Sequence, residues 1–244
     1  MTSGPRPVLL VHGAWHGAWC WEQVIAGLAG RDILGVAVDL PGHGADSGVL
    51  SDLHGDAERV RHALDGFTEP VILVGHSYGG VVITEAGTHP NTSHLVYIAS
   101  FNLDDGESAM SAAVSESATL DHADRPDVLG HVHVTPDGSS TVDDEGARML
   151  FYNDCPDDIA DWAVARLGPQ RIETLSQAPR AVAWRQRPST YAVCTADNIV
   201  HPGLQRALAR RADNTVEWPT GHSPFLSRPE LVVDLLAQVA QSSP

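Results

Sequence analysis

Short runs of apolar residues alternate along this chain with longer stretches that suit helices. The apolar runs are mostly continuous, which is typical of strands buried on both faces of a parallel sheet. They lie at 7–11, 33–40, 70–75, 94–100, 189–195 and 214–218. Helices are expected at 19–29, 54–66, 79–89, 203–211 and 228–241. This alternation predicts an α/β fold with a mostly parallel, doubly wound sheet.

One long segment, from Asn102 to Pro188, separates two of the predicted strands. A structureless loop of that length is uncommon inside a compact domain. We therefore expect a core formed by residues 1–103 and 188–244, with a lid, or cap, inserted at 104–187 over the carboxyl edge of the sheet.

Two patterns within the insertion predict structure of its own. "HVHVTPDGSSTV" (131–142) alternates around a Pro-Asp-Gly turn and predicts a hairpin with polar faces. "CPDDIADWAVARL" (155–167) predicts a helix with Pro156 in its first turn and acidic residues beside the positive helix end.

The stretch "VILVGHSYGG" (71–80) runs from a buried strand into a Gly-rich junction and back into apolar residues. Gly75, Ser77 and Gly79 have the GxSxG form of a nucleophile elbow, a sharp turn between a strand and a helix. Small residues flank the serine because a side chain there would collide with the tight backbone. A Gly-rich turn with an incidental serine fits the flanking strand and helix less well.

A serine nucleophile needs a general base, and the base needs an orienting carboxylate, in the chain order Ser, acid, His. "CTADNIVHPG" follows a predicted strand and presents Asp197, and "WPTGHSP" follows the last strand and presents His222. Asp104 and Asp105 in "FNLDDGES" are the competing acids, because they also follow a strand. The predicted catalytic residues are Ser77, Asp197 and His222.

An oxyanion hole is the third requirement of this chemistry. One expected donor is the backbone N–H of Tyr78, directly after the serine. The other comes from "VHGAWHGAW" (11–19), where Gly13 lets the backbone turn inward and makes the Ala14 N–H the expected donor. His12 is expected to brace this loop by hydrogen bonds and to stay outside the catalysis.

Aromatic residues and histidines supply the candidates for a substrate pocket, although each of them also suits the core. We expect a modest, mainly apolar pocket for small or aromatic acyl groups. The candidates are Trp15, His16, Tyr152, Trp162, Trp184 and Phe225.

The composition narrows the chemistry further. The 244 residues carry a formal net charge of −16, and all 15 basic residues are Arg. The absence of Lys excludes a Schiff-base lysine, a Walker-type phosphate lysine and a lysine general base. A chain without a basic face is a poor match for a polyanion, so nucleic acid is not an expected partner.

Metal, cofactor and membrane sites are not expected either. His131 and His133 share a strand face, but two ligands without a third are weak evidence for a metal. Cys20, Cys155 and Cys194 lack metal or disulfide spacing. No apolar run approaches the roughly 20 residues of a membrane span, and "PVLLVHG" is too short for a signal peptide. These features predict a cytoplasmic protein.

Taken together, the motifs resemble the α/β-hydrolase superfamily, in particular its branch of plant methyl-ester esterases, hydroxynitrile lyases and bacterial esterases. "HGAWHGAWCW", "DLPGHG", "VILVGHSYGG", "VCTADNIV" and "GHSP" follow in the order that the branch uses. The resemblance covers the core and is looser in the lid. It implies Ser77, Asp197 and His222 as the triad, with Ala14 and Tyr78 as oxyanion donors.

Two positions distinguish this chain from the lyases of that branch. Those lyases carry Thr or Asn at the position of Gly13, and the group with Thr also carries Lys at the position of Ser223. Without these groups cyanide is poorly stabilised as a leaving group, so the resemblance favours hydrolysis over cyanohydrin cleavage.

The expected activity is hydrolysis of small-molecule carboxylic esters through an acyl-enzyme, without a cofactor. Three alternatives stay open: a hydroxynitrile or C–C bond lyase on the same triad, a hydrolase of lactones, thioesters or amides, and a non-catalytic ligand-binding protein on a hydrolase scaffold. The last has no need for a complete triad. The sequence specifies neither the natural substrate nor the oligomeric state.

Overall fold

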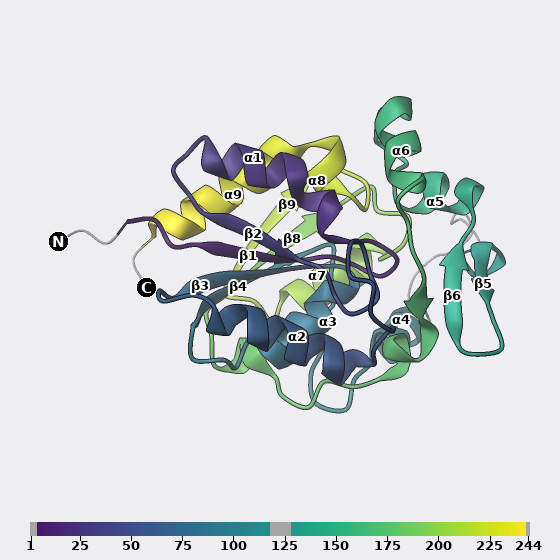
Figure 1. Cartoon of the computed structure of the whole chain (residues 1–244), viewed down its shortest axis with the longest axis horizontal. Coiled ribbons are helices and arrows are strands. Elements are labelled where there is room, and N and C mark those ends of the chain that lie inside the picture. The colour runs from purple at the N-terminus through teal and green to yellow at the C-terminus, as the bar shows by residue number, and fades with distance from the viewer. Residues whose placement is uncertain (1–3, 118–127, 243–244) are drawn as a thin grey trace.

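The computed structural model describes residues 4–117 and 128–242. Within them, six parallel strands form the central sheet in the order β2-β1-β3-β4-β8-β9 (Figure 1). The strands are β1 (Val8–Val11), β2 (Gly35–Val38), β3 (Val71–His76), β4 (Thr92–Ile98), β8 (Ser189–Cys194) and β9 (Asn214–Trp218). The predicted α/β fold with a parallel sheet is confirmed, and all six predicted strands are present.

Helices cover both faces of this sheet. The pair α1 and α9 packs on one face, and α2 and α3 pack together on the other (Figure 1). The helices around the sheet are α1 (Glu22–Ala29), which follows the 3-10 turn η1 (Ala18–Trp21), α2 (Leu53–Asp65), α3 (Tyr78–Ala86), α7 (Pro202–Ala209), α8 (Pro224–Ser227) and α9 (Pro229–Gln241). The short α8, which lies next to the predicted site, was not expected from the sequence.

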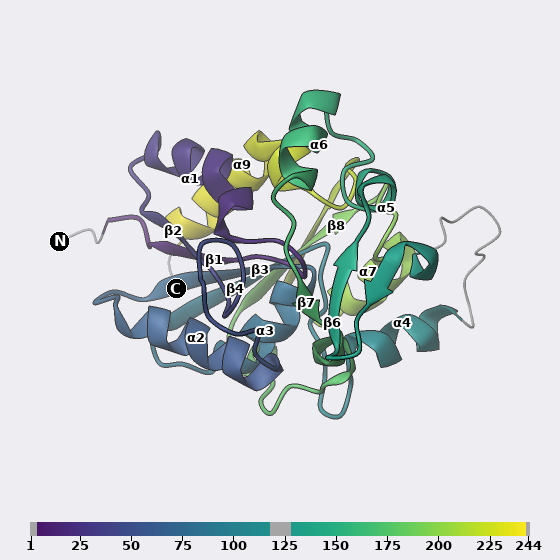
Figure 2. The same cartoon turned by 45° about the vertical axis from the view of Figure 1, so that its right-hand side comes forward.

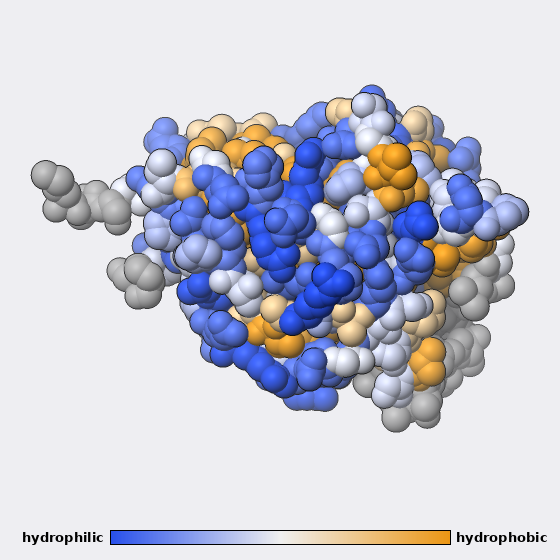
Figure 3. Space-filling view, turned by 60° about the horizontal axis from the view of Figure 1, so that its bottom comes forward, coloured by the Kyte–Doolittle hydropathy of each residue, from blue (hydrophilic) through white to orange (hydrophobic). Residues whose placement is uncertain are grey.

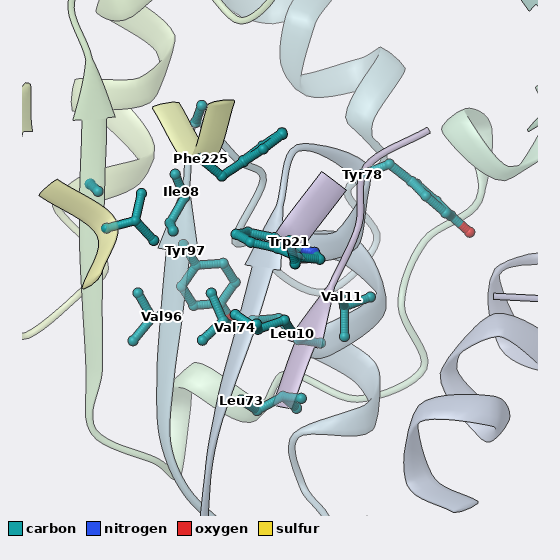
Figure 4. Packing of buried hydrophobic residues seen from close by; sticks show 14 of the residues in the cluster. Leu10, Val11, Trp21, Leu73, Val74, Tyr78, Val96, Tyr97, Ile98 and Phe225 are labelled. Atoms are coloured by element: carbon teal, nitrogen blue, oxygen red, sulfur yellow. The ribbon is translucent and has the colours of Figure 1, made fainter. Parts of the chain in front are cut away.

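The core lies along the central strands. Every residue of β1, β3 and β8 is buried, whereas the edge strands β2 and β9 are partly exposed. Figure 4 shows the packing of Leu10, Val74 and Val96 beneath Trp21. Continuous apolar strands arise here because helices cover both faces, and each fully buried side chain of this size stabilises the fold by about 1.5–3 kcal/mol.

We call residues 104–187 the insert. Its strands β5 to β7 and helices α5 and α6 lie beyond the end of the sheet toward which the strands point (Figures 1 and 2). Its last residues run back along α3, where Arg187 donates to the Thr88 and His89 carbonyls. The strands β5, β6 and β7 form a separate antiparallel sheet. The predicted hairpin and helix are both present, with Pro156 at the N-cap of the helix instead of inside its first turn. The elements are α4 (Ala109–Ser117), η2 (Leu129–His131), β5 (Val132–Val134), β6 (Ser139–Val142), α5 (Asp144–Leu150), α6 (Asp157–Val164), β7 (Gln170–Arg171), η3 (Ile172–Ser176) and η4 (Ala183–Arg185).

The surface is mainly polar on the face seen in Figure 3, where hydrophobic residues form separate patches. Among the described residues, no helix has the length and apolar character that crossing a membrane requires. The three cysteines are free thiols; Cys20 and Cys194 are buried, whereas Cys155 is half-buried.

Candidate active site

Ser77 lies at the junction of β3 and α3 with strained backbone angles, φ 50° and ψ −122°. Such angles are costly for a residue other than Gly and persist only where the surroundings enforce them. A Cβ at Gly75 would lie 2.5 Å from the carbonyl oxygen of Gly79, and one at Gly79 would lie 2.6 Å from the carbonyl oxygen of His12. The turn therefore requires glycine at both positions, which explains the spacing of the motif.

The end of β4 holds this turn in place. The Ser77 N–H donates to the Ile98 carbonyl at 3.2 Å, and the Ser100 hydroxyl donates to the Ser77 carbonyl at 2.7 Å. A Cβ at Gly80 would overlap the Ser100 side chain. Ser100 was missed from the sequence, where it is the first polar residue after an apolar strand.

Asp197 and His222 form a buried hydrogen-bonded pair at the ends of β8 and β9. The His222 Nδ1 lies 2.8 Å from Asp197 Oδ2, and the two residues are 1% and 3% exposed, respectively. Because a carboxylate only accepts, Nδ1–H is the donor, and Nε2 keeps the lone pair that a general base needs.

Besides His222, three further donors hold the Asp197 carboxylate. Oδ1 accepts the backbone N–H groups of Ile199 and Val200 at 2.7 and 2.9 Å, and Oδ2 accepts from Gln205 Nε2 at 2.8 Å. Gln205 is fully buried on α7. It was missed from the sequence, although a polar residue between Leu204 and Leu208 on a short helix is a usable signal.

The competing acids lie elsewhere. Asp104 forms an ion pair with Arg185, and Asp105 is exposed. The structure brings Asp197, and neither of these residues, to the imidazole of His222.

His76, which lies between Gly75 and Ser77 in the elbow motif, connects the elbow to His222. Its Nε2–H donates to the His222 carbonyl at 2.9 Å, and the two rings lie 4.5 Å apart. Burial, followed by the nearby His222, lowers the pKa of His76 well below its usual value, which keeps the ring neutral. Its Nδ1 has no hydrogen-bond partner among the described residues.

The loop after β1 packs directly against the elbow. A Cβ at Gly13 would lie 3.0 Å from the Ser77 Cβ. His12 braces the loop as expected, since its Nδ1–H donates to the Gly13 carbonyl at 2.8 Å and its Nε2 accepts the Leu40 N–H at 3.1 Å. Among the described residues, no acceptor is hydrogen-bonded to the backbone N–H of Ala14 or to that of Tyr78, the two expected oxyanion donors.

The chain was compared with known protein families and structures. A model of the alpha/beta hydrolase family matches residues 8–235. This chain belongs to the alpha/beta hydrolase family. Its relatives include the carbendazim hydrolyzing esterase of a Nocardioides species, which is 30% identical with 94% of this chain and 97% of the relative covered. Methylesterase 17 of Arabidopsis thaliana is 27% identical, with coverage of 98% and 92%.

The crystal structure of polyneuridine aldehyde esterase superimposes on this hydrolase with a TM-score of 0.81 at 20% identity. The superposition covers 96% of this chain and 99% of that one. The resemblance to the methylesterase branch is thereby confirmed at the level of family and fold.

The pocket candidates of this hydrolase fall into two groups. Tyr152 and His16 are hydrogen-bonded to each other at 2.9 Å, and Trp15 Nε1 donates to Ser140 Oγ at 3.2 Å. These three buried residues lie where the insert meets the loop after β1. Phe151, which was not among the candidates, also lies there, with its ring 5.9 Å from that of His222.

The other three candidates have no hydrogen bond to this group among the described residues, although the Phe225 ring lies 6.3 Å from that of His16. Phe225 is fully buried with its ring 4.7 Å from that of His76. Trp162 packs at 5.3 Å on the edge of Trp19 and lines a cavity of about 220 Å³. Trp184 donates to the Leu103 carbonyl at 2.9 Å.

Neither of two mapped cavities reaches Ser77, which is 8% exposed. The larger, of about 580 Å³, is lined by residues of β2 and α2 on the opposite side of β1 from the elbow strand. Ser77, the expected nucleophile, is therefore largely buried.

His131 and His133 share one carboxylate in the insert. Each lies 3.0 Å from an oxygen of Asp143, which also caps α5 by accepting the Gly146 N–H at 2.8 Å. Within residues 4–117 and 128–242, no group of three or more His, Cys, Asp or Glu side chains has a metal-binding arrangement.

Proposed function

We propose that this alpha/beta hydrolase cleaves small-molecule carboxylic esters, with Ser77 as nucleophile, His222 as general base and Asp197 as the carboxylate that orients the base. The observation that carries the proposal is the buried Asp197–His222 hydrogen bond at 2.8 Å beside a strained serine elbow. The names of relatives, an esterase and a methylesterase, support ester hydrolysis.

The mechanism follows from the roles of the individual atoms. Nε2 of His222 takes the Ser77 proton as Oγ attacks the ester carbonyl, and the N–H groups of Ala14 and Tyr78 stabilise the tetrahedral oxyanion. The imidazolium then gives its proton to the departing alcohol, which leaves an acyl-enzyme. A water molecule, deprotonated by His222, then attacks the acyl-enzyme in the same way and releases the acid. The mechanism therefore needs neither a metal nor an organic cofactor.

Hydrolysis is favoured over cyanohydrin cleavage by two positions. Gly13 presents only hydrogen toward the Ser77 Cβ, so no hydroxyl or amide of residue 13 can bind a second polar group of the substrate there. Ser223, directly after the base, is fully buried and supplies no positive charge for a cyanide ion. An ester needs neither group.

The test is hydrolysis of a short-chain p-nitrophenyl ester series by the wild type and by Ser77→Ala. We expect the alanine variant to lose at least about 10⁴-fold in kcat/KM while its circular dichroism and Tm stay close to those of the wild type. A mandelonitrile assay runs in parallel and should release no cyanide. Ester turnover that persists in Ser77→Ala would contradict the proposal.

Covalent labelling gives an independent readout. A fluorophosphonate should add one label to the wild type, and peptide mass spectrometry should place it on Ser77. A label on another residue would assign the nucleophile elsewhere.

A further inference from the structure

The insert makes three hydrogen bonds to the loop that carries the proposed oxyanion donor Ala14. The Gly168 N–H donates to the Trp15 carbonyl at 2.8 Å, Trp15 Nε1–H donates to Ser140 Oγ at 3.2 Å, and the Tyr152 hydroxyl lies 2.9 Å from His16 Nε2. These contacts come from three separate places in the insert, before β7, in β6 and after α5.

Two of these contacts have a fixed direction, because each partner is committed elsewhere. His16 Nδ1 lies 2.8 Å from the Ala14 carbonyl, and a carbonyl only accepts, so Nδ1 carries the proton and Nε2 accepts from Tyr152. Burial lowers the pKa of His16 to about 4, which preserves this neutral tautomer at neutral pH. Ser140 Oγ donates onward to the Gln170 carbonyl at 2.8 Å and so accepts from Trp15.

The loop is poorly held by its own backbone. Trp15 has a left-handed conformation with φ 62°, which is unfavourable for a bulky side chain, and the turn bond from the His16 N–H to the Gly13 carbonyl is long at 3.4 Å. A strained segment persists only where its surroundings enforce it. The surroundings here include the elbow and Asp39, which accepts the Ala18 N–H at 2.6 Å, but the hydrogen bonds to the Trp15 and His16 side chains from outside the loop come from the insert. The bonded side chains of Trp15, His16, Ser140 and Tyr152 are all buried.

We propose that the insert assembles the oxyanion hole: Tyr152, through His16, and Ser140, through Trp15, are positioning residues that orient the Ala14 backbone. The inference rests on the proposed function. It changes the expected roles of Trp15, His16 and Tyr152, because residues that only line a pocket govern KM, whereas residues that position an oxyanion donor govern kcat. A displaced insert would leave Ser77 accessible with an incomplete hole.

The primary test is Tyr152→Phe, which removes only the hydroxyl that donates to His16. The matched control is Tyr97→Phe, which removes another buried tyrosine hydroxyl, whose partner Thr84 at 3.1 Å lies on α3 and outside the loop. Loss of a whole oxyanion donor costs about 10²–10³-fold in kcat, so misplacement of one should cost roughly 10-fold or more. The KM of Tyr152→Phe should stay within about twofold of the wild type.

A boronic acid separates this effect from substrate binding, since its tetrahedral adduct with Ser77 uses the oxyanion hole. Its Ki should rise in Tyr152→Phe by the same factor as kcat falls. If wild-type turnover depends on Ser77 but Tyr152→Phe has the kcat and Ki of the wild type, this inference is overturned and the proposed function stands. A raised KM with unchanged kcat would also overturn it, in favour of a pocket role.

A double-mutant cycle tests the connection between the two residues. In His16→Asn the amide nitrogen can still donate to the Ala14 carbonyl, so this variant should retain more kcat than His16→Ala. Because Asn has no group in the place of Nε2, adding Tyr152→Phe to it should have little further effect. Multiplicative effects of the two substitutions on kcat would overturn the connection.

If Tyr152→Phe fails to fold, Trp15→Phe, which removes the donor to Ser140, is measured in its place. The same fall in kcat and the same rise in boronic acid Ki are expected. Unchanged values would overturn the proposal.

Discussion

The central sheet and the insert are stabilised in different ways. In the sheet, whole strands such as β1 and β3 are apolar and fully buried. In the insert, β5 and β6 have exposed and half-exposed positions, and ion pairs such as Arg148 with Asp161 join neighbouring elements. The His131 and His133 contacts to Asp143 are of the same polar kind.

This difference assigns separate tasks to the two regions: the sheet positions the proposed reacting groups, and the insert covers them. Strand ends on an apolar sheet hold the proposed reacting groups at fixed positions, as catalysis requires. The insert contacts the site through ring contacts of Phe151 and through hydrogen bonds to the loop after β1, and hydrogen bonds can be broken and remade at modest cost. Changes in the sheet should therefore have larger effects than changes in the insert.

The largest difference in kcat should come from replacing one aspartate by asparagine in each region. Asp197→Asn removes the acceptor that fixes the His222 tautomer and should lower kcat by about 10⁴-fold. Asp104→Asn, at the start of the insert, is the matched control and should leave kcat within about threefold. Steady-state ester kinetics of both variants make the measurement. A severe loss in Asp104→Asn alone would reassign the catalytic acid.

Core packing gives the next largest effect. Leu73→Ala in β3 deletes a fully buried side chain and should lower the free energy of unfolding by about 2–5 kcal/mol. Val134→Ala in β5 shortens a side chain in a residue that is 54% exposed and should change it by less than about 0.5 kcal/mol. Urea denaturation measures both. Equal losses would contradict the difference in burial between β3 and β5.

A pH effect should follow from Asp56, on α2. Its Oδ2 accepts from the Tyr78 hydroxyl at 2.6 Å, the Tyr78 ring points away from Trp21 and Phe225 (Figure 4), and burial raises the pKa of Asp56 to about 7. The folded protein therefore retains a proton that the unfolded chain loses near pH 4. The free energy of unfolding should fall as pH rises from about 4 to 7.

The Asp56→Asn variant removes this dependence. Its stability relative to the wild type should improve by at least about 1 kcal/mol between pH 5 and pH 8. Glu58→Gln, an exposed position on the same helix, is the control and should show no such trend. Parallel pH profiles for Asp56→Asn and the wild type would show that Asp56 ionises normally.

The smallest effect should come from Asp143 in the insert, where the shift has the opposite sign. Chiefly through the Gly146 N–H, the pKa of Asp143 is lowered to about 2. Its stabilising contribution is present above pH 4 and should be lost as pH falls from about 4 to 2. Asp143→Ala should lower Tm slightly at pH 7 and less at pH 2, whereas Asp143→Asn, which can still cap α5, should change it less. A Tm loss as large as that of Leu73→Ala would contradict the proposed difference between the regions.

The sequence also predicted more of the core than of the insert. In the core, the apolar runs identified all six strands, and the Gly75-Ser77-Gly79 spacing predicted the turn that the structure shows. In the insert, the hairpin and one helix were predicted, but α4, α5 and β7 were not. Short, half-exposed elements lack a clear periodicity, because their positions depend on contacts with other parts of the chain.

The residues that support the site were also not predicted from the sequence. Ser100 and Gln205 hold the elbow and the carboxylate, yet nothing in their local sequence indicates what they bind. Ser100 meets Ser77, 23 residues earlier, only after β3 and β4 have paired, and a contact between residues so far apart leaves no local pattern. Gln205 is only 8 residues from Asp197, but their contact depends on how α7 packs against β8.

By itself, the sequence determined the parallel sheet and the tight turn at Ser77, and it predicted the chain order of the proposed acid and base, because continuous burial and tight turns impose local requirements on residue type. Only the tertiary structure decided that Asp197 and not Asp104 reaches His222, that Ser77 is largely buried, and that Tyr152 and Ser140 contact the loop carrying Ala14. Those outcomes depend on where distant strand ends and the insert meet, and that is set by the packing of the whole chain.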